Sequence, residues 1–127
     1  MSNESDAASL DRYRGVLERH DPETCAALDR VPETVYRKTR SLDARTKELV
    51  MIAMLTALKG SDAALRHHVR RAVELGVPKE AVLEAIELVI TPAGMPAFEH
   101  GLMAWADALG EKGLEVEAAF SKLPDKT

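Results

Sequence analysis

One histidine in the sequence occupies a position that suits acid–base chemistry. On a helix that turns about 100° per residue, His68 falls within a narrow stripe of small and apolar residues that includes Ala64, Leu65 and Ala72. The stripe predicts that this imidazole points inward, where a side chain that titrates near neutral pH is able to give or take a proton. His67 lies about a quarter turn away and nearer the polar side, so we expect it in solvent or at an interface.

An acidic residue is the natural partner for an inward imidazole. Glu48 stands in the first turn of a long apolar helix, where the helix dipole favours a negative charge, and its inward neighbours Ile52 and Leu55 predict partial burial. Each member of the pair also has a structural interpretation. His68 is then a hydrogen-bonded core histidine and Glu48 an ordinary first-turn acid. Both interpretations stay open on the sequence.

Helical periodicity and helix-terminal residues predict the elements that carry this pair. Asp21, Asp43 and Ser61 are typical N-caps, and Gly76 is a typical C-terminal stop. Residues 49–58 are apolar nearly all round, which predicts a central helix surrounded by other protein. No stretch alternates as a strand does, so the expected fold class is all-α, with about six to seven helices. The first helix should end near residue 20, and further helical segments should span 22–31 and 33–40, with a break or kink at Pro32, and then 43–59, 61–75, 78–91, 97–110 and 114–120. If residues 22–40 form one kinked helix, the total is seven.

The chain is expected to form one domain. Residues 1–8 read as a disordered tail, residues 9–120 as a single domain and residues 121–127 as a polar tail. Hydrophobic residues make up 46% of the 127 residues and aromatic residues only 4%, so the core must be aliphatic. The apolar helices exceed what one small core covers, which favours a homo-oligomer.

Composition also limits the class of partner. A net charge of -4 offers no basic surface for nucleic acid or an anionic membrane. No apolar run is long enough to span a bilayer, and the N-terminus lacks the order of a signal peptide. The single cysteine, Cys25, has no partner for an internal disulfide, which favours a cytoplasmic location. Arg66, Arg70 and Arg71 are most simply a solvated basic face.

No metal or cofactor is expected from the sequence. His67 and His68 are adjacent and diverge by about 100° on a helix, and no His-x-x-x-His or Glu-x-x-His set supports them. One cysteine provides no thiolate cluster.

Three segments resemble the carboxymuconolactone decarboxylase family, which includes the alkylhydroperoxidase D-like thiol proteins. They are LDARTKELVMIAMLTAL, LRHHVRRAVELGVPKEAVLEAIELV and AGMPAFEHGLMAWADAL. The most specific features are KEL at 47–49, the spacing of His68, Ala72 and Gly76, and GMPA at 94–97. The resemblance implies the alkylhydroperoxidase D-like fold, assembled as a trimer or hexamer with sites near subunit contacts.

The sequence departs from the thiol members of that family at two positions. Those members carry a Cys-x-x-Cys pair seven and four residues before the histidine, and Ser61 and Ala64 stand there in this chain. Neither side chain forms the thiolate that attacks a peroxide or disulfide. The chain therefore resembles the cysteine-less decarboxylase branch, whose members share a Leu-Arg-x-His run like residues 65–68.

The resemblance implies a division of roles among the polar residues. A decarboxylase of this type needs a proton donor, an apolar pocket and a cation for the substrate carboxylates. His68 is the expected donor, and Glu48 is expected to orient it or act as a base. Arg45 or Arg66 is expected to clamp a carboxylate, and His67 is a further candidate for substrate binding.

Three functions remain in competition on the sequence alone. The first is a lyase, independent of cofactors, that acts on a small carboxylated lactone or related acid by His/Glu chemistry. The second is an alkylhydroperoxidase D-like peroxidase, which would need a thiol from elsewhere. The third is a non-catalytic oligomer that binds a small molecule.

Overall fold

The computed structural model describes residues 3–111. Over that range it contains seven α-helices, one π-helix and no strand, so the all-α prediction is confirmed. The predicted helix over 114–120 and the predicted tail over 121–127 lie outside the described residues. None of the described helices is long and apolar enough to cross a bilayer.

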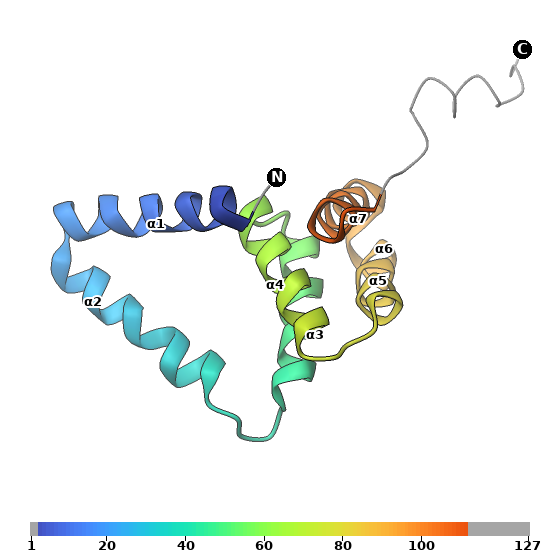
Figure 1. Ribbon diagram of the computed structural model, residues 1–127, viewed down its shortest axis with the longest axis horizontal. Coiled ribbons are helices and arrows are strands. Elements are labelled where there is room, and N and C mark those ends of the chain that lie inside the picture. Colours follow the sequence, from blue (N-terminus) through green and yellow to red (C-terminus); the bar gives the residue numbers. More distant parts are fainter. Residues whose placement is uncertain (1–2, 112–127) are drawn as a thin grey trace, which may run out of the picture.

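The first three elements form an arm that projects from the rest of the chain. The arm consists of α1 (Asn3–His20), α2 (Pro22–Val31) and the π-helix η1 (Pro32–Arg37). In Figure 1, α1 runs outward from α4, α2 returns, and a loop leads back to the start of α3. Among the three elements, α1 makes the main contact with the rest of the structure, by packing on α4.

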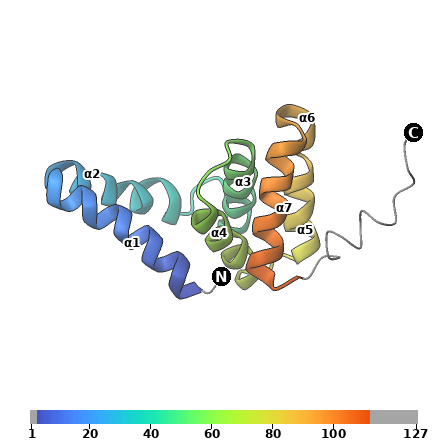
Figure 2. The same ribbon diagram turned by 90° about the horizontal axis from the view of Figure 1, so that it is seen from above.

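The remaining helices form the body. They are α3 (Ala44–Ala57), α4 (Asp62–Glu74), α5 (Lys79–Glu87), α6 (Ile90–Ala93) and α7 (Met95–Leu109). Figure 2 shows the arm on one side of α3 and α4, with α5, α6 and α7 on the other. Helix α3 packs against α4, α5 and α7. It is therefore the central element of the body, as predicted. The expectation that other protein surrounds it on all sides is wrong for the described residues, because Val50 and Met54 on α3 and Leu58 at its C-cap remain exposed.

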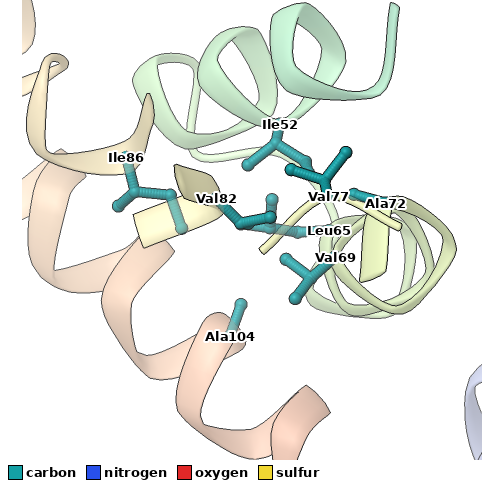
Figure 3. Packing of buried hydrophobic residues seen from close by; sticks show 8 residues of the cluster. All are labelled: Ile52, Leu65, Val69, Ala72, Val77, Val82, Ile86 and Ala104. Carbon is teal, nitrogen blue, oxygen red and sulfur yellow. The ribbon is translucent and has the colours of Figure 1, made fainter. Parts of the chain in front are cut away.

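An aliphatic core joins these helices. Eight buried side chains, contributed mainly by α3, α4, α5 and α7, point toward a common centre (Figure 3). They are Ile52, Leu65, Val69, Ala72, Val77, Val82, Ile86 and Ala104. The aromatic residues Phe98 and Trp105 only border this cluster. The prediction of an aliphatic core is confirmed. This core holds α3 against α4, and these two helices carry Glu48 and His68.

The predicted helix caps are confirmed. The Asp21 carboxylate accepts a hydrogen bond from the Thr24 amide at 3.0 Å. The Asp43 carboxylate does the same for the Thr46 amide at 2.8 Å. Ser61 caps α4 in the same way, and Gly76 follows α4 with a φ of 93°, which few residues other than glycine adopt. These local contacts set where α2, α3 and α4 begin.

Three segments differ from the prediction. Helix α1 begins at Asn3, so the disordered tail expected over residues 1–8 does not hold from residue 3 onward. The helix expected over 33–40 is the π-helix η1 and ends at Arg37. Pro32 has no N–H to donate, which interrupts the α-helical bonding pattern at that point. The helix expected over 78–91 divides into α5 and α6, and Pro92 fits within the first turn of α6.

Candidate functional site

Glu48 and His68 meet between α3 and α4. The Nδ1 atom of His68 lies 2.7 Å from Oε2 of Glu48. The Glu48 side chain is only 2% exposed, whereas the His68 side chain is 13% exposed. A buried carboxylate that accepts the Nδ1 hydrogen fixes the ring orientation and stabilises the positive charge of an imidazolium. The other ring nitrogen, Nε2, then remains for a ligand.

Tyr36 of the arm is the third member of the cluster. Its hydroxyl oxygen lies 3.4 Å from Nδ1 of His68, and the two rings meet edge to face with centroids 5.5 Å apart. Because Glu48 is much closer to the same nitrogen, the tyrosine hydroxyl makes the weaker of the two contacts. The ring of Tyr36 therefore acts mainly as a wall beside the imidazole.

A pocket of about 780 Å³ opens beside this cluster. Its walls come from the end of α2, from η1, from the loop that follows η1, and from α3 and α4. The residues that line it are Val31, Pro32, Val35, Tyr36, Arg37, Arg40, Ser41, Leu42, Lys47, Val50, Met51, Met54, His67 and His68. A concave, largely apolar site with a few convergent polar groups is the usual form of a small-molecule site.

Lys47 ties the arm to the body at this pocket. Its ammonium group donates to the backbone carbonyl oxygens of Val35, at 3.4 Å, and of Tyr36, at 3.2 Å, and also to that of Lys38. These carbonyls lie at the end of η1, where a helix has unpaired acceptors. Lys47 precedes Glu48 directly, so the start of α3 positions both Tyr36 and the partner of His68.

His67 also lines the pocket, next to His68. The two rings meet edge to face with centroids 5.2 Å apart. Partial removal from water lowers the pKa of the His67 imidazole below its usual 6.5, and the neighbouring His68 lowers this pKa further. His67 is therefore a neutral hydrogen-bonding group near neutral pH, and its place in the pocket is compatible with the substrate-binding role expected for it.

The two arginines expected to clamp a carboxylate are placed elsewhere. Arg45 donates through Nε to the carbonyl oxygen of Leu75 at 2.8 Å, and so caps the end of α4 beside Gly76. Arg66 is 4% exposed and pairs with Asp6 at 2.7 Å. Neither residue lines the pocket that contains His68. The cations that line it are Arg37, Arg40 and Lys47.

The basic face expected on α4 is in part a buried ion-pair cluster. Asp6 of α1 binds Arg66 and also Arg70, the latter at 2.8 Å. The hydrogen bond from Arg66 is the main cause that lowers the pKa of the Asp6 carboxyl from 3.8 to about 2. The solvated-face interpretation is therefore wrong for Arg66 and Arg70. The buried stripe of α4 is accordingly centred on Leu65, Arg66 and Val69, with His68 at its edge.

The single thiol lies apart from this cluster. Cys25 is 3% exposed on α2, and its Sγ atom lies 3.9 Å from the backbone carbonyl oxygen of Arg14. Ser61 and Ala64, which stand where thiol relatives carry cysteines, form the first turn of α4. A thiol that attacks peroxide must be accessible and ionised, and Cys25 has little access to solvent.

Sequence reasoning missed Tyr36 and the three cations of the pocket. Tyr36 and His68 are separated by 32 residues in the chain, and only the return of the arm toward α3 brings the two rings together. A signal for two of these cations is the run of basic residues before Asp43, in which Arg37 and Arg40 line the pocket. Within residues 3–111, no group of three or more histidine, cysteine or acidic side chains is arranged to hold a metal ion.

Comparisons with known proteins identify relatives over most of the chain. Two proteins of Methanocaldococcus jannaschii, both named as uncharacterized, align with it. MJ1511 is 25% identical over 97 residues, which is 76% of this chain and 89% of that protein. MJ0742 is 27% identical over 88 residues, or 68% of this chain and 83% of that protein.

A solved structure and a family profile complete the comparison. The crystal structure of apo-lpg0406, a carboxymuconolactone decarboxylase family protein from Legionella pneumophila, superposes with a TM-score of 0.70 at 17% identity. The match covers 87% of this chain and 97% of that one, and shows a shared fold. The profile of the carboxymuconolactone decarboxylase family matches residues 22–108. The chain therefore belongs to the carboxymuconolactone decarboxylase family.

Proposed function

We propose that this protein is a lyase that decarboxylates a small carboxylated lactone or a related acid, with His68 as proton donor. The observation that carries the proposal is the 2.7 Å contact between His68 Nδ1 and Glu48 Oε2 at the wall of a pocket of about 780 Å³. Family membership supports this class of substrate. An imidazole beside a buried carboxylate is also a common acid–base arrangement.

The proposed reaction has two steps. The bond between the substrate carbon and its carboxylate breaks, CO2 leaves, and the electron pair stays on the carbon as an enolate conjugated with the ring carbonyl. The imidazolium of His68 then donates its Nε2 proton to that carbon, while Glu48 keeps its hydrogen bond to Nδ1. The apolar walls of the pocket favour loss of charge from the leaving carboxylate.

Replacement of His68 tests the proposal directly. In the His68→Gln protein we expect kcat for release of CO2 from 4-carboxymuconolactone to fall by about 10²–10⁴-fold, because the proton donor is gone. In Glu48→Gln we expect a smaller fall in kcat and an altered pH profile, because an amide still accepts the Nδ1 hydrogen but does not stabilise the imidazolium charge.

His20→Gln is the matched control, because His20 is exposed at the end of α1 and does not line the pocket. It should turn over substrate as the wild type does. Turnover by His68→Gln at the wild-type rate would exclude His68 as the proton donor. Failure of the wild type to release CO2 from carboxylated lactones would exclude the lyase function itself.

A further inference from the structure

The pocket beside His68 carries an unusual balance of charge. The protein as a whole has a net charge of -4. Among the described residues that line the pocket, however, are the cations Arg37, Arg40 and Lys47, and no aspartate or glutamate. Glu48 lies behind the imidazole and is 2% exposed, so it does not present a charge to the pocket. This balance favours an anionic ligand.

The three cations differ in the hydrogen-bond and ion-pair partners that they already have. Arg37 is paired with Glu33 of the same π-helix. Lys47 donates to the backbone carbonyls at the end of η1. Within residues 3–111 no hydrogen bond or ion pair of Arg40 is found, and its side chain is exposed in the loop before α3. Arg40 is therefore the cation with its full donor capacity available to a ligand carboxylate.

Apolar side chains dominate the rest of the pocket lining. Val35 of η1 is 57% exposed, and Val50 and Met54 of α3 are 42% and 47% exposed. All three line the pocket, and they face it from two different elements. When an apolar ligand covers these exposed side chains, removal of their apolar surface from water contributes favourably to the free energy of binding. The volume of about 780 Å³ also suits a ligand with an extended apolar body.

We infer that the natural ligand is an amphipathic carboxylic acid, which keeps one carboxylate at Arg40 and lays an apolar chain or ring along Val35, Val50 and Met54. The inference rests on the proposed function, because it takes this ligand to be the substrate whose reactive carbon lies at His68. It narrows the substrate class from any small carboxylated lactone to acids with a sizeable apolar portion.

Calorimetric titration with linear carboxylates tests this inference without any turnover. Across hexanoate, octanoate and decanoate, we expect the Kd to fall by about fourfold for each added methylene. Octanamide, which has the same length but no charge, should bind at least about tenfold more weakly than octanoate. Equal Kd values across the series, or equal affinity for octanoate and octanamide, would overturn the inference.

A charge variant tests the role of Arg40 separately. We expect Arg40→Gln to weaken octanoate binding by about three- to tenfold and to leave octanamide binding unchanged. Arg71→Gln is the matched control, because Arg71 is exposed on α4 and does not line the pocket. Equal effects of the two substitutions on octanoate binding would exclude Arg40 as the carboxylate site.

The outcomes of the binding and turnover experiments are separable. If the protein binds octanoate selectively but decarboxylates none of the lactones, the inferred ligand class is supported and the lyase function is excluded. If the protein decarboxylates a small lactone but its Kd for linear carboxylates does not depend on chain length, the lyase function is supported and the amphipathic ligand class is excluded.

Discussion

The orientation of the His68 ring depends on the groups that contact its nitrogen Nδ1. Glu48 holds Nδ1 at 2.7 Å, and the Tyr36 hydroxyl lies 3.4 Å from the same atom. One N–H cannot satisfy two acceptors equally well, so the closer carboxylate takes the hydrogen bond. The contribution of Tyr36 then comes mainly from its ring, which packs edge to face on the imidazole.

This division of roles predicts different results for two replacements of Tyr36. We expect Tyr36→Phe to keep KM and to lower kcat by only about two- to fivefold, because the hydroxyl contact is long. We expect Tyr36→Ala to raise KM more strongly, because it removes a wall of the pocket. Steady-state kinetics with 4-carboxymuconolactone measures kcat and KM for both variants. A loss of kcat in Tyr36→Phe as large as in His68→Gln would show instead that the hydroxyl takes part in proton transfer.

Helix α3 is the element on which the site depends. It carries Lys47, which lines the pocket, and Glu48, which contacts His68. The buried stripe that begins at Glu48 continues along the helix through Ile52 to Thr56, where α3 packs closely on α7. At that crossing, Gly101 faces Thr56, which is fully buried. A Cβ atom at position 101 would lie 2.5 Å from Cγ2 and 2.6 Å from Oγ1 of Thr56. The absence of a side chain on Gly101 therefore allows α3 and α7 to approach.

Gly101→Ala should accordingly destabilise the protein. We expect the free energy of unfolding to fall by about 1–3 kcal/mol, because the methyl group overpacks a rigid contact. Gly15→Ala is the control, because both glycines are helical but nothing lies within 4 Å of a Cβ at position 15. That change should raise stability by up to about 1 kcal/mol through helix propensity. Urea denaturation measures both, and equal effects would contradict the close packing of α3 and α7.

The arrangement of the whole molecule depends on how the arm is attached to the body. The arm carries Tyr36 and one wall of the pocket, and α1 joins it to α4 through the Asp6–Arg66 ion pair, which links residues 60 positions apart in the chain. Several apolar side chains on both arm and body are exposed, including Tyr13, Leu58 and Leu88. The homo-oligomer expected from the sequence stays a prediction.

The Asp6 cluster predicts a specific dependence of stability on pH. The pKa of the Asp6 carboxyl is lowered from 3.8 to about 2, so its contribution is complete above pH 3.8 and is lost as the pH falls toward 2. We expect Asp6→Asn to lower the free energy of unfolding by about 2 kcal/mol at neutral pH. Urea titrations of both proteins should show this difference shrink between pH 3.8 and 2. A difference that stays constant over that range would exclude the ion pair as its cause.

Much of the fold could be predicted because its signals are local. The caps at Asp21, Asp43 and Ser61 bind amides only three residues away, so the nearby sequence suffices to place them. The apolar run of α3 likewise indicates a central helix from composition alone. The stripe on α4 predicted an inward His68, and the structure places that imidazole at the edge of the buried face, beside Glu48. Its catalytic role stays a prediction.

Tertiary structure decided which charged groups surround the imidazole. Arg45 and Arg66 have the chemistry of a carboxylate clamp, but a backbone carbonyl and Asp6 engage them elsewhere. Tyr36 and Arg40 reach the pocket only because the arm turns back toward α3. Helix periodicity states which face of its own helix a residue occupies, and it contains no information about which distant segment covers that face. The sequence was therefore sufficient for the caps and for most of the helices of the body. The start of α1, the π-helix η1, the division between α5 and α6, and the lining and charge of the pocket emerged only from the tertiary structure.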